Sequence, residues 1–351
     1  MTDTSPLLNN PNYQTLLHNL KTQIRQARVK AALAVNRELV LLYWHIGAQI
    51  LEQQAAQGWG AKAIEQLSRD LRQEFPQVKG FSLRNLKYMR AFAAAYPDLA
   101  IVQQVVAQIP WGHNIRILDR VKDPEVRLWY ARATVEYGWS RNVLVHQIET
   151  NLYERQGKAI SNFAATLPQP QSDLVQNLLK SEYNLEFLEL ETTVRERELE
   201  RALIEHMQLF LLELGVGFAF VGSQYPLEIG GEEFFIDLLF YHLQLRCYVV
   251  IELKTTAFKP AYAGQINFYV NAVDDLLRHE TDQPTIGIVL CRSQHETIVR
   301  YALQGMNQPI GVSTYRTAAE LPAEYQGKLP SAEELQAQID SAIASQFGTE
   351  K

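Results

Sequence analysis

The segment FFIDLLFYHLQLRCYVVIELK places charged side chains within two runs of apolar residues. Asp237 interrupts the first run, and Glu252 and Lys254 interrupt the second run near its carboxyl end. Burying a carboxylate among apolar residues is costly unless the group is paired or binds a metal. Residues two apart on a strand point to the same face, so Glu252 and Lys254 share one. The runs read as paired neighbouring strands, and we therefore expect Asp237 to lie beside Glu252.

These residue types suit one kind of chemistry. Asp237, Glu252 and the backbone carbonyl of Leu253 offer hard oxygen ligands of the kind that Mg²⁺ prefers, with Mn²⁺ as a substitute. A bound ion would acidify a water molecule and neutralise charge on a phosphate. Lys254 would orient that water or stabilise the developing negative charge. The pattern predicts metal-dependent hydrolysis of a phosphodiester bond. The alternative is a structural ion pair, which rarely repays the desolvation of its charges.

The hydrophobic period along the chain indicates the elements that position these residues. After a leading helix from Val194 to Leu214 the period changes, and Gly230-Gly231 reads as a hairpin turn. The expected order is strands at 218–229, 234–241 and 247–253, a helix at 262–278, a strand at 285–290, a helix at 295–304 and a strand at 310–315. His242, directly after the second strand, is expected on the surface. This order predicts a three-layer α/β domain.

The first half of the chain repeats apolar residues at helical spacing and is expected to be all-helical. A polar, proline-bearing stretch then separates it from the α/β pattern, which is typical of a linker. The expected domains are a helical domain over 13–165, a linker over 166–180, an α/β domain over 181–320 and a C-terminal helical tail over 321–351.

Basic residues gather on one predicted helix of the first half. Arg84, Lys87 and Arg90 lie near one face of a helix that Ser82 is expected to cap and that follows another helix and a turn. Helix, turn and helix is the layout of a DNA-reading unit, and such a face can lie along phosphates. The helical domain is therefore expected to bind DNA or to mediate assembly. The alternative is a solvated face of a helical bundle.

Ile236-Asp237, followed fifteen residues later by Glu252-Leu253-Lys254, resembles the PD-(D/E)XK nuclease motif, with Ile236 in place of the usual proline. The blocks around it, FLLELGVGFAFVGSQ and FKPAYAGQINFYVNAVD, and the blocks WGAKAIEQLSRDLRQEFP and GFSLRNLKYMRAF in the first half, resemble YhcG-like bacterial proteins. The resemblance covers roughly Tyr13 to Tyr315. It implies an all-α N-terminal domain followed by a restriction-endonuclease-like α/β domain.

The resemblance also implies further site residues. The helix after the third strand often supplies a polar side chain to such a site, and Gln265 matches that position. The leading helix commonly supplies a glutamate, for which Glu200 is chosen, with Glu205 and Glu213 as rivals that spacing does not exclude. Gln224, near the first strand, is expected to contact the phosphate.

The expected function is that of a Mg²⁺-dependent endonuclease acting on DNA. RNA is a possible substrate, because the nucleophile is water and not the 2′-hydroxyl. The alternative is a nuclease fold that no longer cuts and serves as a scaffold for nucleic acid or protein. Cutting both strands of a duplex calls for two active sites, which favours a homodimer.

The composition excludes several classes of protein. A net charge of −6 excludes a protein that coats nucleic acid by bulk charge, although not a local basic groove. The two cysteines lack the spacing of a disulfide scaffold or a zinc site and fit a reducing compartment. Neither a signal peptide nor a membrane-spanning segment is recognisable, so we expect a cytoplasmic protein without a membrane partner.

Overall fold

The structure is a computed structural model that describes residues 11–58, 60–188, 190 and 194–317. The chain divides into two compact units between Ile148 and Glu149. The helical tail expected over 321–351 lies outside the described residues. Among the helices that are described, none combines the length and the apolar composition that crossing a bilayer requires.

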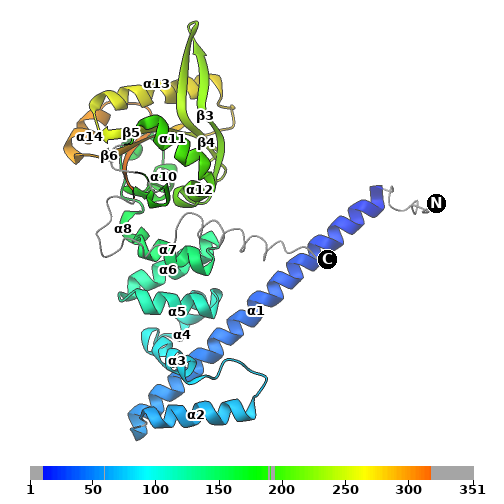
Figure 1. Ribbon diagram of the computed structural model, residues 1–351. Helices are drawn as coiled ribbons and strands as arrows, with labels where there is room; N and C mark the ends of the chain where they lie inside the picture. Colours follow the sequence, from blue (N-terminus) through cyan, green and yellow to red (C-terminus); the bar gives the residue numbers. More distant parts are fainter. Residues whose placement is uncertain (1–10, 59, 189, 191–193, 318–351) are drawn as a thin grey trace. The chain divides into compact units, whose positions relative to one another are not determined.

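The first unit is helical, as predicted, and runs from blue to green in Figure 1. Ser82 caps its third helix, because the side chain accepts a hydrogen bond from the backbone N–H of Asn85. The elements are α1 (Pro11–Gln57), α2 (Ala61–Glu74), α3 (Leu83–Ala95), α4 (Leu99–Gln104), η1 (Val106–Gln108), α5 (Trp111–Arg120), α6 (Pro124–Tyr137) and α7 (Arg141–Glu149).

Helices α1 and α3 approach each other closely at Gly47. A Cβ atom on Gly47 would clash with the backbone carbonyl of Met89 and would lie 3.0 Å from the Cβ of Ala93. Backbone atoms cannot move aside as the end of a flexible side chain can. The glycine therefore sets the distance at which the two helices pack.

The substitution Gly47→Ala is expected to destabilise the helical unit by about 1–3 kcal/mol, the usual cost of overpacking. A matched control is Gly264→Ala, also within a helix but with open space where its Cβ would lie. It should be neutral or stabilising, because alanine favours helices over glycine by roughly 1 kcal/mol. Urea or thermal unfolding followed by circular dichroism measures both changes. An equal gain for the two variants would contradict the close approach.

The second unit is built on a seven-stranded mixed sheet with the strand order β1-β7-β6-β5-β4-β3, to which β2 adds by pairing with β7. The strands are β1 (Ile160–Ser161), β2 (Glu182–Asn184), β3 (Phe218–Ile229), β4 (Glu232–His242), β5 (Cys247–Ala257), β6 (Ile286–Ser293) and β7 (Ile310–Arg316). Strands β3, β4 and β5 are antiparallel neighbours, whereas β5, β6 and β7 are parallel.

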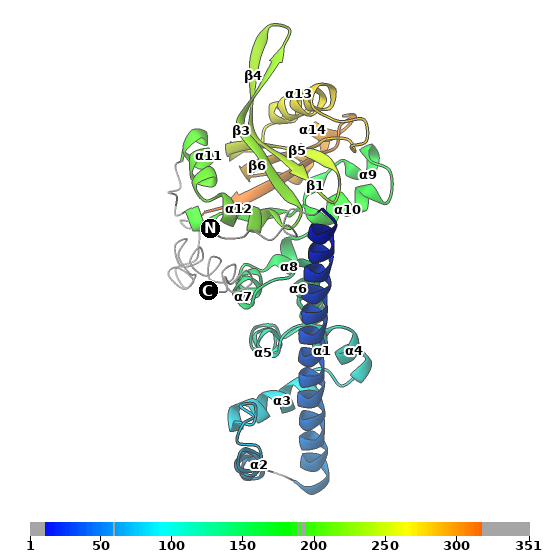
Figure 2. The same ribbon diagram turned by 90° about the vertical axis from the view of Figure 1, so that its right-hand side faces the viewer.

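Helices cover both faces of this sheet, as Figure 2 shows for α11 and α12 on one side and α13 and α14 on the other. Alternate residues of the central strands enter two separate hydrophobic cores: Ile251 packs with α11 and α12, and Val250 packs with α13. The helical elements are α8 (Leu152–Arg155), α9 (Phe163–Thr166), α10 (Gln171–Leu178), η2 (Glu186–Leu188), α11 (Glu196–Glu205), α12 (Met207–Leu214), α13 (Pro260–Leu276) and α14 (Glu296–Leu303). The predicted three-layer α/β domain is confirmed.

Two local predictions differ from the structure. The leading helix expected over 194–214 is two helices, α11 and α12, because the chain turns at His206. His242, expected on the surface, is fully buried, and its ring Nδ1 accepts a hydrogen bond from the N–H of Leu245. It packs against Gly217, where a Cβ atom would come within 2.7 Å of the ring.

The predicted linker over 166–180 is part of the second unit instead. Leu167, Val175 and Leu179 are buried in its core, and α10 lies within the segment. The first unit likewise ends before 165, because residues 149–165 supply strand β1 to the sheet. Prolines and polar residues give the 166–180 segment the composition of a loop. Its few apolar side chains, however, pack against residues that are distant in the sequence.

A network of buried ion pairs connects Arg155 and Lys180 to Glu213 of α12. The Glu213 side chain is 2% exposed, and its Oε1 accepts hydrogen bonds from Arg155 Nη1 at 2.7 Å and from the N–H of Asn184 at 2.9 Å. Lys180 Nζ lies 3.2 Å from the same oxygen. Burial alone would raise the pKa of Glu213, but Lys180 and Arg155 lower it to about 2. The carboxylate is therefore held ionised between two buried cations.

Candidate active site

Asp237 and Glu252 come together through the pairing of β4 with β5. Leu238 lies opposite Ile251, and continuing this antiparallel register places Asp237 opposite Glu252 on the same face of the sheet. Asp237 Oδ2 accepts a hydrogen bond from the N–H of Leu253 at 2.9 Å. Asp237 is half-buried, and Glu252 is 2% exposed. The two carboxylates predicted from the sequence thus occupy one edge of the hydrophobic core.

Lys254 and Gln265 both donate to Glu252. Lys254 Nζ lies 2.8 Å from Glu252 Oε1, and Gln265 Nε2, from α13, lies 2.6 Å from the same oxygen. The ammonium group also lies 3.8 Å from Glu196 Oε2 and 5.2 Å from the centroid of the Tyr262 ring. One oxygen of Glu252 is therefore held by two donors, and its direction is fixed.

Glu200 and Gln224 complete the group. Gln224 Nε2 donates to Glu200 Oε2 at 2.8 Å and to Asp237 Oδ1 at 3.2 Å, so one amide bridges two carboxylates from different elements. Gln224 reaches them from an irregular part of β3: its φ is +42°, in the left-handed region, and the register shifts between Phe220 and Gly222. Such strained backbone often occurs at functional sites.

The two rivals of Glu200 lie elsewhere. Glu205 is exposed at the carboxyl end of α11, and Glu213 belongs to the buried ion network. The basic residues predicted on the helical unit, Arg84, Lys87 and Arg90, are all on α3 of the first unit.

Three residues near this group were not predicted from the sequence: Glu196, Tyr262 and Tyr269. Glu196 lies four residues before Glu200 on the same helix face, so the spacing was available as a signal. Tyr269 lies one turn after Gln265 on α13, and its hydroxyl is hydrogen-bonded to that side chain. Tyr262 was not distinguishable from other aromatic residues without the position of Lys254.

The electrostatics of the group favour a cation. Burial, together with the charge of Asp237, raises the pKa of Glu252 to about 7. Burial also raises the pKa of Asp237 and of Glu200. Glu252 Oε2 is buried and has no hydrogen-bond partner among the described residues. A divalent cation would compensate the charge of these neighbouring carboxylates and would give the buried oxygen a partner.

The donor set indicates which ion fits. Within the described ranges, no three His, Cys, Asp or Glu side chains converge as a complete metal-binding group. An ion held by Asp237 and Glu252 would take its remaining ligands from the Leu253 carbonyl, from water and from phosphate. Mg²⁺ is commonly bound in this way, by one or two carboxylates with retained waters.

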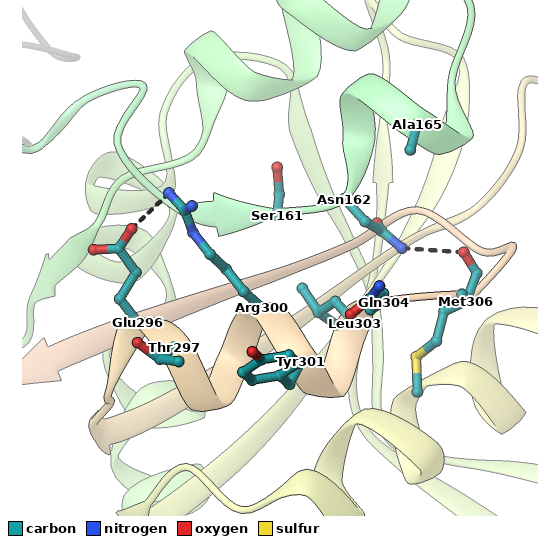
Figure 3. A pocket seen from close by; sticks show the side chains of 11 residues that line it. Ser161, Asn162, Ala165, Glu296, Thr297, Arg300, Tyr301, Leu303, Gln304 and Met306 are labelled. Atoms are coloured by element: carbon teal, nitrogen blue, oxygen red, sulfur yellow. Dashed lines mark hydrogen bonds and ion pairs between the residues drawn. The ribbon is translucent and has the colours of Figure 1, made fainter.

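A separate cavity of the same unit is lined by polar side chains, some of which are paired with one another or with the backbone. It has a volume of about 570 Å³ and lies between α14 and the segment of β1 and α9 (Figure 3). Arg300 lies 2.6 Å from Glu296, and Asn162 Nδ2 donates to the carbonyl of Gln308 at 2.9 Å. Because β1 and β3 are at opposite ends of the strand order, this cavity is separate from the carboxylate group.

Comparison with known proteins identifies both halves of the chain. Residues 19–155 match the DUF1016 N-terminal domain, and residues 176–330 match the YhcG PDDEXK nuclease domain. The YhcG protein of Escherichia coli (strain K12), which carries a provisional designation as a nuclease, is 32% identical over 350 residues, covering 89% of this chain and 92% of that protein.

A solved structure gives a more limited match. The crystal structure of a repair endonuclease from Pyrococcus abyssi aligns with 36% of this chain and 48% of that chain, at 17% identity and a TM-score of 0.26, which is too low to carry an argument. The assignment depends instead on the two domain matches and the full-length relative. The chain therefore belongs to the YhcG family, with a DUF1016 N-terminal domain followed by a nuclease domain of the PDDEXK type.

Proposed function

We propose that the protein is a Mg²⁺-dependent endonuclease that hydrolyses DNA phosphodiester bonds with water as the nucleophile. The observation that carries the proposal is the buried oxygen of Glu252, which faces no donor among the described residues although Asp237 and Lys254 lie beside it. Glu213 in the buried ion network also has an oxygen without a partner among the described residues, but that carboxylate lies between two cations. Glu252 lies instead beside a second carboxylate, Asp237, whose charge raises the pKa of Glu252. An orphaned oxygen next to a second carboxylate is instead suited to an ion.

Asp237, Glu252 and the Leu253 carbonyl would hold Mg²⁺ or Mn²⁺. Such an ion, when bound, acidifies a water molecule and offsets charge on the phosphate. Gln265 is a positioning residue, because it fixes one oxygen of Glu252. Gln224 has the same role for Asp237 and also holds Glu200.

Lys254 contributes as a cation and not as a base. Burial by itself favours the neutral amine, but the hydrogen bond and charge of Glu252, with the charge of Glu196, raise the pKa of Lys254. The side chain therefore stays protonated at neutral pH. An ammonium group at this position can stabilise negative charge that develops on a phosphate in the transition state.

The first test is cleavage of a panel of labelled DNA and RNA substrates by the full chain in Mg²⁺, Mn²⁺ or EDTA. We expect cleavage of DNA in either metal, none in EDTA, and none by Asp237→Ala. Metal binding is measured separately as a rise in the melting temperature, which Mg²⁺ should give for the wild type and not for the variant. Cleavage confined to RNA would correct the substrate. Nucleic-acid binding without cleavage or metal binding would favour the scaffold.

A further inference from the structure

A cavity in the helical unit has a cationic lining. It has a volume of about 510 Å³ and lies where the loop before α3 and the starts of α3, α5 and α7 meet. Its cationic lining residues are Lys79, Arg84, Arg116 and Arg141. No aspartate or glutamate lines it among the residues that the structure describes.

Hydrogen bonds within the unit hold the wall of this cavity. Asn85 joins two elements, since its Nδ2 donates to the Gly80 carbonyl at 2.6 Å and its Oδ1 accepts from Trp111 Nε1 at 2.7 Å. The Trp111 ring packs at 5.0 Å from the Tyr43 ring, edge to face. The aromatic and amide groups are thus used to build the wall, which leaves the cationic groups to meet a ligand.

Arg84 is oriented by an aromatic ring. Its guanidinium lies over the Tyr88 ring, 5.6 Å from the centroid. The Tyr88 hydroxyl in turn donates to Asp119 Oδ2 at 3.1 Å. Stacking on an aromatic face positions a guanidinium without neutralising it, so Arg84 keeps its charge for an anion.

Four like charges around one cavity repel one another unless an anion lies between them. The amino ends of helices α3, α5 and α7 add positive potential at the same place. Arginine side chains form paired hydrogen bonds with phosphate, and helix amino ends commonly bind it. The lining therefore selects a phosphate over a neutral or cationic ligand.

We propose that this cavity binds phosphate groups of a nucleic-acid chain. The choice of a nucleic acid as the source of the phosphate rests on the proposed nuclease function, whereas the phosphate chemistry does not. The site differs from the predicted face of α3: Arg84 lines the cavity, Lys87 is exposed outside it, and Arg90 Nη1 lies 3.4 Å from Gln54 Oε1. The cavity is lined instead by Arg116 of α5 and Arg141 of α7, neither of which belongs to the predicted face.

The test measures binding of labelled single-stranded and duplex DNA to the full chain in EDTA, by fluorescence anisotropy over a series of salt concentrations. The double variant Arg116→Ala, Arg141→Ala should bind DNA more weakly by about tenfold or more. It should also lower the slope of log affinity against log salt by about 2, because each lost phosphate contact removes about one unit. The control, Arg72→Ala with Arg132→Ala, removes the same charge from exposed positions outside the lining. It should keep the wild-type slope.

Calorimetry with inorganic phosphate and with a mononucleotide separates the possible sources. If these probes bind the wild type and not the double variant, while the DNA slope is unchanged, the ligand is a free nucleotide or phosphate and the nucleic-acid proposal is wrong. If neither probe nor DNA responds to the variant, no phosphate binds there. Circular dichroism verifies that both double variants fold.

The two proposals fail separately in these experiments. DNA that binds through the cavity and is never cut would leave this inference standing and would refute the nuclease. If the protein cuts DNA and the variant of Arg116 and Arg141 binds DNA like the wild type, the nuclease proposal stands and the cavity proposal is refuted.

Discussion

The substitution Lys254→Met is expected to slow DNA cleavage in Mg²⁺ by about 10²–10³-fold, the usual loss when one preorganised electrostatic donor is removed. Methionine keeps most of the volume of the side chain, which is 8% exposed, but removes its charge. DNA affinity in EDTA should change little, because the ammonium group is engaged by Glu252 and not spread over the surface. Single-turnover cleavage at saturating DNA measures the chemical step.

A matched control is Lys259→Met, an exposed lysine at the start of α13. It removes the same charge from the same region and should cut at the wild-type rate. Thermal unfolding of both variants excludes a folding defect. Wild-type cleavage by the Lys254 variant would show that the ammonium group takes no part in the reaction.

The second large effect is expected on stability. Glu213→Ala should lower the free energy of unfolding by about 3–5 kcal/mol, because it leaves Arg155 and Lys180 buried and without their carboxylate. For a unit of this size the melting temperature should fall by roughly 10 °C. Differential scanning calorimetry measures the transition of the second unit. The control is Glu154→Ala, which breaks an exposed pair with Lys158 and should cost less than about 1 kcal/mol.

The same network predicts a dependence on pH. The pKa of Glu213 in the folded state is about 2, below the usual 4.5 of an exposed glutamate. Its contribution is therefore fully present above pH 4.5 and is lost as the pH falls towards 2. Glu213→Gln should flatten the fall in stability over this interval. An unchanged acid transition would mean that the carboxylate is not held as the structure shows.

Runs of apolar residues predicted the central elements of the second unit, because β5, β6 and β7 are buried on both faces. The short connection between β4 and β5 also determined that Asp237 would meet Glu252. The choice among Glu200, Glu205 and Glu213 needed the turn between α11 and α12, which separates side chains that a single helix would align. No local pattern marks that turn.

The parts that sequence reasoning missed depend on distant partners. Strands β1 and β2 have two and three residues, too few for any period, and form only because β7 offers its edge. The cationic residues of the cavity come from the loop before α3 and from three helices, and of these residues only Arg84 belonged to the basic face predicted on α3. Such convergence is a property of packing and not of spacing.

Strand β3 has twelve residues and, within the part of the chain that the structure describes, pairs on one side only, with β4. A regular edge of this length is a template for aggregation through strand addition. The register shift at Gly222, the left-handed Gln224 and Pro226, which lacks an N–H, interrupt that edge in succession. The distortion that turns Gln224 towards Asp237 therefore also hinders the pairing of this edge with another chain. Straightening β3 would misplace the amide and at the same time make the protein prone to form fibrils.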